Sequence, residues 1–176
     1  MRIAVDLDGV QYKFHSAYRY MMVNMRGVDM PPDSEWSYWD WPDQFTTPAD
    51  REWMWSEGVK LGLFRYGHIV KGTVLGVRAL AEHHDLVVVT HRPRQAVADT
   101  IAWLSFVNLP YTGIHILSNQ EPKTEVPWDV LIDDKPENII DAVRAGRRGI
   151  LFEQPWNEGF VAEAAAGWPD VVRRLT

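Results

Sequence analysis

Short apolar runs recur along the chain at intervals that suit a parallel sheet. They are rich in Val, Ile and Leu and do not alternate with polar residues, which is typical of strands buried on both faces. The runs are residues 3–7, 86–89, 114–117, 130–132 and 149–152. Apolar residues at helical spacing lie between them. This alternation predicts an α/β fold with a doubly wound (Rossmann-like) parallel sheet of about five strands and right-handed crossovers.

The stretch 11–72 interrupts this alternation and is too long for a simple strand-to-helix loop. Apolar residues from Phe14 to Met25 are spaced three and four apart, which predicts an amphipathic helix ending near Gly27. A second helix is expected around residues 50–60, starting at Thr47 or Pro48. We therefore expect a small helical cap inserted directly after the first strand.

The expected cap is rich in tryptophan. Five of the nine Trp fall within residues 36–55. Either these rings pack together as the core of the cap, or some of them form an aromatic wall for a flat ligand such as a nucleobase. The expected division of the chain is a core domain of residues 1–10 and 73–176 and a Trp-rich cap of residues 11–72.

Composition and charge narrow the class of protein. A hydrophobic fraction of 46% supports a real core, and a net charge of −6 argues against non-specific binding to DNA or to an anionic membrane. The lack of cysteine excludes disulfides, thiolate nucleophiles and zinc–sulfur sites. No stretch resembles a signal peptide or is apolar enough to cross a bilayer, so a cytoplasmic protein is expected.

Polar residues at the strand ends carry the candidate chemistry. Ligands of open α/β sheets bind outside the carboxyl ends of the strands. Carboxylates follow the first and fourth apolar runs, a threonine ends the second, and a lysine comes shortly after the third. These residues are Asp6, Asp8, Thr90, Lys123, Asp133 and Asp134. We expect them to converge at one edge of the sheet.

Such a cluster suits phosphoryl transfer. Neighbouring carboxylates need a hard cation, and oxygen ligands favour Mg²⁺. Asp6 would attack phosphorus and form an aspartyl-phosphate. Asp8 would serve as the acid and base, because neighbouring carboxylates raise its pKa. Thr90 and Lys123 would hold the phosphate oxygens and stabilise the transition state.

These residues resemble the four motifs of the haloacid dehalogenase-like (HAD) phosphatase superfamily, in the right order: Asp6-Leu7-Asp8-Gly9-Val10, Thr90, Lys123 and Asp133-Asp134. The chain is most similar to the 5′(3′)-deoxyribonucleotidases. The shared features are an aromatic residue after the first motif, here Phe14, the Asp-Asp-Lys-Pro tip at 133–136, and the closing segment 152–157.

The resemblance implies a nucleoside monophosphate as the small-molecule substrate. It implies that Phe14 and a cap tryptophan, for which we choose Trp55, sandwich the base. Asp134 would bind Mg²⁺ directly and Asp133 would support it, so the implied metal set is Asp6, Asp8, Asp133 and Asp134. Asn157 is a candidate for the rim of the metal site, and a homodimer is a possible assembly.

Two residues beside Thr90 depart from the family pattern. His91 and Arg92 stand where a small polar residue is common, and we assign both to substrate binding. Arg92 either binds phosphate or is simply solvated. Lys135 stands where arginine is common in the family.

Two other functions stay open. One is a phosphatase for nucleic-acid 3′ ends, although the acidic balance and the lack of a basic stripe make nucleic acid an unlikely partner. The other is a non-catalytic ligand-binding protein with the same fold. The presence of both Asp6 and Asp8 speaks against it, because a protein without activity has no need of the acid.

Overall fold

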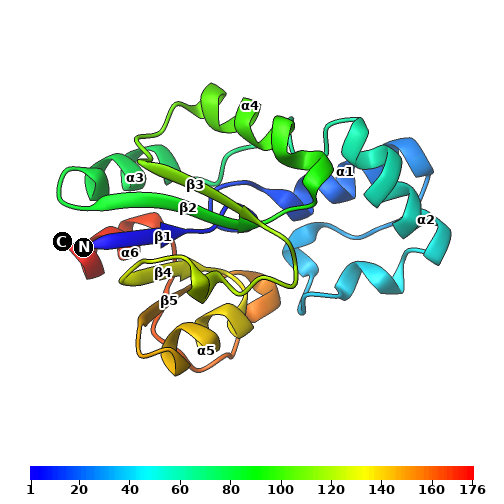
Figure 1. Ribbon diagram of the computed structural model, residues 1–176. Coiled ribbons are helices and arrows are strands. Elements are labelled where there is room, and N and C mark those ends of the chain that lie inside the picture. The colour runs from blue at the N-terminus through cyan, green and yellow to red at the C-terminus, as the bar shows by residue number, and fades with distance from the viewer.

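The computed structural model describes all residues 1–176 and contains one six-stranded parallel sheet in the order β3-β2-β1-β4-β5-β6. The doubly wound parallel sheet is thus confirmed (Figure 1). The strands are β1 (Arg2–Val5), β2 (Asp85–His91), β3 (Gly113–Leu117), β4 (Val130–Asp133), β5 (Arg148–Phe152) and β6 (Ala164–Ala165). The sixth strand, β6, exceeds the expected five because two alanines paired with β5 leave no apolar run to recognise.

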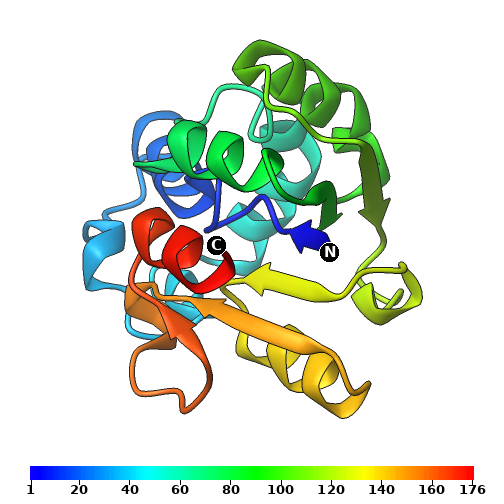
Figure 2. The ribbon, with the colours of Figure 1, turned by 90° about the vertical axis from the view of Figure 1, so that its left-hand side faces the viewer.

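Helices cover both faces of the sheet (Figures 1 and 2). They are α3 (Thr73–Ala81), α4 (Val97–Val107), α5 (Pro136–Arg144) and α6 (Trp168–Leu175). Successive strand residues face opposite sides. Ile3 and Val5 therefore pack with α3 and α6, whereas Ala4 packs with α5. None of the helices combines the length and the apolar composition that crossing a bilayer requires.

The insertion after β1 forms a group of short helices beyond the carboxyl ends of the strands (Figure 1). They are α1 (Phe14–Arg26), η1 (Asp33–Glu35), η2 (Trp41–Gln44), α2 (Pro48–Trp53) and η3 (Met54–Gly58). As expected, α1 ends at Gly27, whose φ of 69° suits glycine. Helix α2 starts after Thr47, which forms a capping box with Asp50.

This insertion forms most of one hydrophobic cluster, to which the core adds only Ala96. Met22, Trp36, Met54, Leu63 and Phe64 are among its fully buried members. Two short segments, one at residues 11–13 and the other at residues 68–70, connect the insertion to the sheet. Hydrogen bonds from Lys13 N to His68 O and from Val70 N to Gln11 O hold these two segments together.

The division of the chain remains our proposal. It assigns residues 11–72 to the cap and residues 1–10 and 73–176 to the core. Tyr12, at the boundary, packs with Leu7 and Val88 of the core.

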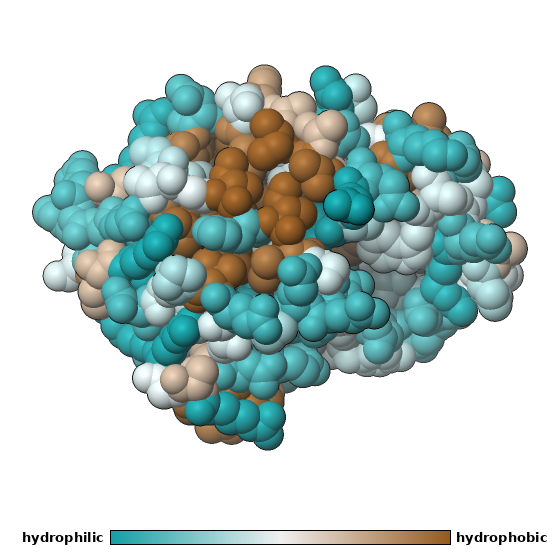
Figure 3. All heavy atoms as spheres, viewed as in Figure 1, coloured by the Kyte–Doolittle hydropathy of each residue, from teal (hydrophilic) through white to brown (hydrophobic).

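The outer surface carries an apolar area over α4 and β3 (Figure 3). Phe106 is 87% exposed there, and Ile101 and Ile114 are also exposed.

The carboxyl ends of the strands lie on the side of the sheet that faces the cap (Figure 1). This edge of the sheet is therefore the place to look for a site.

Candidate active site

Strand pairing brings the predicted residues to one edge of the sheet. Val5 of β1 pairs with Ile132 of β4, so the residues that follow, Asp6 and Asp133, lie side by side. Thr90 is the next-to-last residue of the adjacent strand β2. All three side chains are buried.

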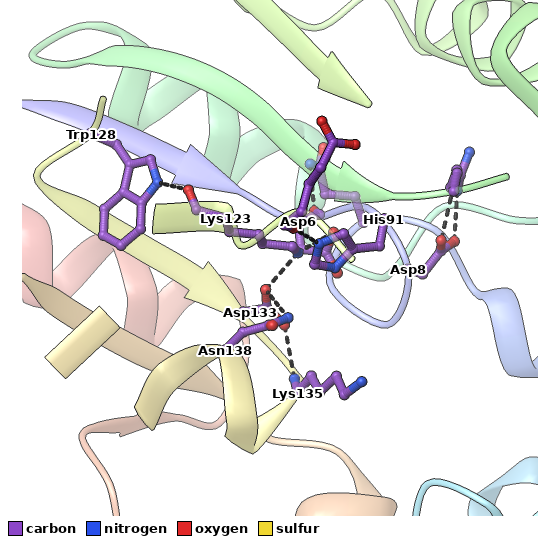
Figure 4. A network of polar contacts seen from close by, with 11 residues as sticks. Asp6, Asp8, His91, Lys123, Trp128, Asp133, Lys135 and Asn138 are labelled. Carbon is purple, nitrogen blue, oxygen red and sulfur yellow. Dashed lines mark hydrogen bonds and ion pairs between the residues drawn. The ribbon is translucent and has the colours of Figure 1, made fainter. Parts of the chain in front are cut away.

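Asp133 is the most fully bonded residue of the edge (Figure 4). Its Oδ2 accepts hydrogen bonds from Lys123 Nζ at 2.6 Å and from Asn138 Nδ2 at 2.9 Å. Its Oδ1 accepts one from the backbone N–H of Lys135 at 2.9 Å. Because its oxygens are occupied, Asp133 is suited to hold its neighbours in place, as the supporting role predicted for it requires.

Lys123 lies between two carboxylates. Its Nζ is 2.6 Å from Asp133 Oδ2 and 2.9 Å from Asp6 Oδ1. Burial alone would lower its pKa, but the carboxylates of Asp133 and Asp6 raise the pKa above its ordinary value. The Trp128 Nε1–H donates to Lys123 O and anchors the turn. Lys123 is therefore a fixed positive charge beside Asp6.

Asp134 is buried but only partly bonded. Trp156 Nε1 donates to its Oδ2 at 2.8 Å, whereas its Oδ1 has no partner. Asn157 Nδ2 donates to the backbone oxygen of Asp134 at 2.7 Å. Gly9, whose φ is 78°, makes room for this side chain, because a Cβ at Gly9 would overlap Asp134 Oδ2.

The donor set fits a hard divalent cation. Asp6, Asp133 and Asp134 each offer one carboxylate oxygen, and these oxygens lie within 4.8 Å of one another. Burial raises the pKa of Asp134 well above its ordinary value, and the Asp133 and Asp6 carboxylates raise it further. An unpartnered buried Oδ1 in such a negative environment is the kind of oxygen ligand that Mg²⁺ takes. Asp6 and Asp134 would hold the ion, and Asp133 would orient them.

Asp8 makes a separate pair with Arg92. The Nε and Nη2 atoms of Arg92 donate to Asp8 Oδ2 at 2.9 Å and Oδ1 at 2.6 Å. Burial is the main factor that raises the pKa of Asp8; Arg92 opposes the rise and Asp6 adds a smaller one. Asp8 lies outside the group of three carboxylates. Its role as a metal ligand stays a prediction.

The two residues after Thr90 have well-defined partners. Arg92 is 2% exposed, so the alternative that it is solvated is wrong. His91 Nε2 lies 2.8 Å from the carbonyl oxygen of Glu121, in the loop before Lys123 (Figure 4). Thr90 Oγ1, by contrast, is buried and has no partner, which leaves it available to a phosphate oxygen.

Phe14 and Trp55 stack directly on each other. Their ring centroids are 6.1 Å apart with an interplanar angle of 17°, and Phe14 also stacks on Phe64 at 5.7 Å. A base between two rings needs about 7 Å, twice the ~3.5 Å contact distance of carbon atoms. A sandwiched base therefore requires the two rings to separate. Trp55 is 47% exposed, which leaves part of its ring accessible.

Sequence reasoning gave no role to Trp156 or Asn138. Trp156 holds Asp134 and also packs against His15 of the cap, with ring centroids 3.8 Å apart. The closing segment 152–157 was a signal for this region, but nothing distinguished this tryptophan from eight others. Asn138 lies in the first turn of α5, where it reaches back to Asp133.

Solved structures share the fold of this chain. A haloacid dehalogenase-like family protein from Streptococcus pneumoniae superposes with a TM-score of 0.64 at 16% identity, covering 99% of this chain and 98% of that one. A HAD-hydrolase from Bacillus subtilis, described as bound to magnesium, gives 0.65 at 12% identity, with 99% and 98% covered. The fold is that of the HAD-like hydrolases.

Within that class, the sequence matches one family over nearly its whole length. The model of the family "5′ nucleotidase, deoxy (Pyrimidine), cytosolic type C protein" covers residues 1–175. The chain therefore belongs to this family of HAD-like nucleotidases and is a hydrolase of the phosphatase type. A curated relative from Chlorobaculum tepidum, named "Putative 5′(3′)-deoxyribonucleotidase", is 28% identical over 180 residues, 96% of this chain and 87% of that protein.

Proposed function

We propose that the protein is a Mg²⁺-dependent phosphomonoesterase that hydrolyses (deoxy)nucleoside monophosphates, a 5′(3′)-deoxyribonucleotidase acting through an aspartyl-phosphate on Asp6. The observation that carries this proposal is the position of Lys123, whose Nζ lies between Asp6 and Asp133. A buried nucleophile beside a fixed cation suits attack on an anionic phosphorus.

The reaction divides into two steps. A carboxylate oxygen of Asp6 forms a bond to phosphorus as the ester P–O bond breaks, and Asp8 gives its proton to the leaving oxygen. Water then attacks the phosphorus and passes a proton to Asp8 as the Asp6–phosphorus bond breaks. Lys123 and Thr90 bind the phosphate oxygens in both steps. When bound by Asp6 and Asp134, Mg²⁺ neutralises charge on the phosphate.

The nucleotide part of the proposal rests on family membership and on the name of the Chlorobaculum relative. The aromatic cap offers rings on which a base can stack, and we assign Phe14 and Trp55 to it. His91 and Arg92 are the other residues assigned to substrate binding. In the structure the guanidinium of Arg92 is paired with Asp8 at 2.6 Å and has no exposed surface.

A substrate panel with metal control tests the proposal. Phosphate release is measured with deoxynucleoside 5′- and 3′-monophosphates, sugar phosphates, p-nitrophenyl phosphate and a 3′-phosphorylated oligonucleotide. We expect the mononucleotides to be preferred, a chelator to abolish activity and Mg²⁺ to restore it. Preference for the oligonucleotide would favour the 3′-phosphatase, and binding without turnover a non-catalytic protein. Full activity in the chelator would overturn the metal assignment.

Two further expectations concern the protein in the cell. We expect a cytoplasmic location and a possible homodimer. Light scattering coupled to size-exclusion chromatography measures the molar mass in solution, against 20.3 kDa for one chain.

A further inference from the structure

Arg92 is a fully enclosed charged side chain near the site. Its side chain has no exposed surface. The guanidinium lies 4.7 Å from the ring centre of Tyr12 and 4.8 Å from that of Phe64. Its Nη1 donates to Thr100 Oγ1 at 3.1 Å, and Thr100 in turn donates to Ala96 O. Two rings and a hydroxyl therefore fix the plane of the guanidinium.

This fixed plane faces Asp8. The Nε–Oδ2 and Nη2–Oδ1 contacts of 2.9 and 2.6 Å form the two-bond fork typical of arginine and carboxylate. A carboxylate has about four acceptor sites, and the fork occupies two of them. Each oxygen of Asp8 keeps a free position, so the fork sets the direction in which Asp8 can exchange a proton.

We propose that Arg92 is a positioning residue that acts through Asp8, rather than a ligand of the substrate phosphate. The inference rests on the proposed function, in which Asp8 is the acid and base. Arg92 aims one carboxylate oxygen at the leaving oxygen in the first step and at the water in the second. The proton that Asp8 gives in the first step returns to it in the second, so the cycle balances.

The two roles of Arg92 predict different kinetics. Phosphate binding would affect every phosphomonoester alike. Aiming the acid matters only when the leaving group needs a proton, as the ribose oxygen of a nucleotide does and p-nitrophenolate does not. The value of kcat/KM reports the steps up to the formation of phosphorylated Asp6. It therefore separates the two roles.

The experiment compares Arg92→Met with the wild type on thymidine 5′-monophosphate and p-nitrophenyl phosphate. General acid catalysis contributes about 10²–10⁴-fold, so we expect kcat/KM for the nucleotide to fall about 10–100-fold. For p-nitrophenyl phosphate it should change less than about threefold, because that step needs no acid. The second step still needs Asp8, so a burst of p-nitrophenolate should precede slow turnover.

Three further variants keep the result interpretable. Arg92→Lys retains the charge but loses the two-bond fork. Its kcat/KM should likewise fall for the nucleotide and stay nearly unchanged for p-nitrophenyl phosphate. Thr100→Val removes only the hydroxyl that accepts from Arg92 Nη1, so the loss of kcat/KM should be smaller but again confined to the nucleotide. This variant tests the inference even if Arg92→Met fails to fold. Arg94→Met removes an exposed arginine two residues away and should behave as the wild type.

Two outcomes overturn the inference, and they differ from failure of the proposed function. Equal losses of kcat/KM on both substrates would assign Arg92 to phosphate binding or to folding. A wild-type-like Arg92→Lys enzyme would show that charge alone suffices. If the wild type hydrolyses neither substrate, the proposed function itself fails, and the positioning role falls with it.

Discussion

The sheet edge and the cap are built from different interactions. At the edge, buried charges meet at hydrogen-bond distance, as Lys123 Nζ does with Asp133 at 2.6 Å. In the cap, aromatic rings pack with their centroids 5.2–6.5 Å apart, as Phe14 does with Phe64 at 5.7 Å. A buried charge needs its partner, because leaving it unpaired costs several kcal/mol. Aromatic rings pack either offset-stacked or edge-to-face over a range of about 4.5–7 Å between centroids, so their contacts fix the geometry less tightly.

The comparison indicates that the two regions have different roles, with catalysis at the sheet edge and substrate recognition in the cap. The directional hydrogen bonds and ion pairs of the edge suit the chemistry proposed for Asp6 and Asp8. The partly exposed rings of the cap suit the substrate recognition proposed for Phe14 and Trp55. The cap also contacts the core at two places, where Phe64 covers Arg92 and His15 packs against Trp156.

The largest effect is expected at the edge. Asp6→Asn keeps the shape of the side chain but removes the attacking carboxylate, so turnover should fall by about 10³-fold or more. Phosphate release and thermal unfolding are measured together. The fold should survive, since the rest of the edge keeps its partners.

The matched control for this variant is Asp141→Asn, at an exposed position of α5. It should retain wild-type turnover. More than about a tenth of wild-type activity in Asp6→Asn would exclude the aspartyl-phosphate mechanism.

The edge was largely predictable from the sequence, because an apolar run that stops at a polar residue marks a strand end. Asp6, Thr90 and Asp133 follow this rule. Lys123 lies outside it, and only the order of the motifs singled it out. The pairing of Arg92 with Asp8 was not predictable, because it joins residues 84 positions apart through side chains alone.

The cap was predictable only in outline. Helix α1 and its end at Gly27 follow from periodicity and the glycine. Which rings stack has no such signal, because nine tryptophans in one chain allow many packings. In the core, α6 was missed as well, since an eight-residue helix at the end of the chain gives a short pattern.

The second effect concerns the contact between cap and core. Burial lowers the pKa of His15 to about 3 from an ordinary 6.5, although Asp33 opposes the shift. The folded protein therefore keeps His15 neutral below pH 6.5 while the unfolded chain takes up a proton, so stability falls as the pH falls from 6.5 towards 3.

Each pH unit in this window is worth about 1.4 kcal/mol. Between pH 7.5 and 5, the wild type should therefore lose about 2 kcal/mol more stability than His15→Phe. Urea unfolding at the two pH values measures this difference. His83→Phe, at an exposed position, should keep the wild-type dependence. Equal losses in the wild type and His15→Phe would show that His15 is protonated without cost.

The third effect concerns the metal. Trp156→Phe removes the N–H that donates to Asp134 Oδ2 but keeps a ring against His15. Loss of a residue that orients a metal ligand typically lowers metal affinity about 10–100-fold, and we expect about tenfold here. The Mg²⁺ concentration for half-maximal activity measures it, with kcat at saturating Mg²⁺ nearly unchanged. An unchanged Mg²⁺ requirement would exclude this role for Trp156.

The smallest effect is expected at the rim of the cap. Trp55 is 47% exposed and stacks on Phe14 with one face, so a base can use only the remaining surface unless the rings separate. One stacking contact is worth about 1 kcal/mol at the low end of the range, so Trp55→Ala should raise KM for a nucleoside monophosphate about fivefold. KM for p-nitrophenyl phosphate should not change, because the phosphate site is untouched. Tyr20→Ala, at an exposed position of α1, controls for general loss of an aromatic side chain.

Phe14→Ala is the sharper variant, since it removes both the stack on Trp55 and the packing on Phe64. If Phe14→Ala raises KM for the two substrates equally while Trp55→Ala changes neither, the rings serve only to pack the cap. The base would then be bound elsewhere, and the edge of the sheet would keep its proposed chemistry.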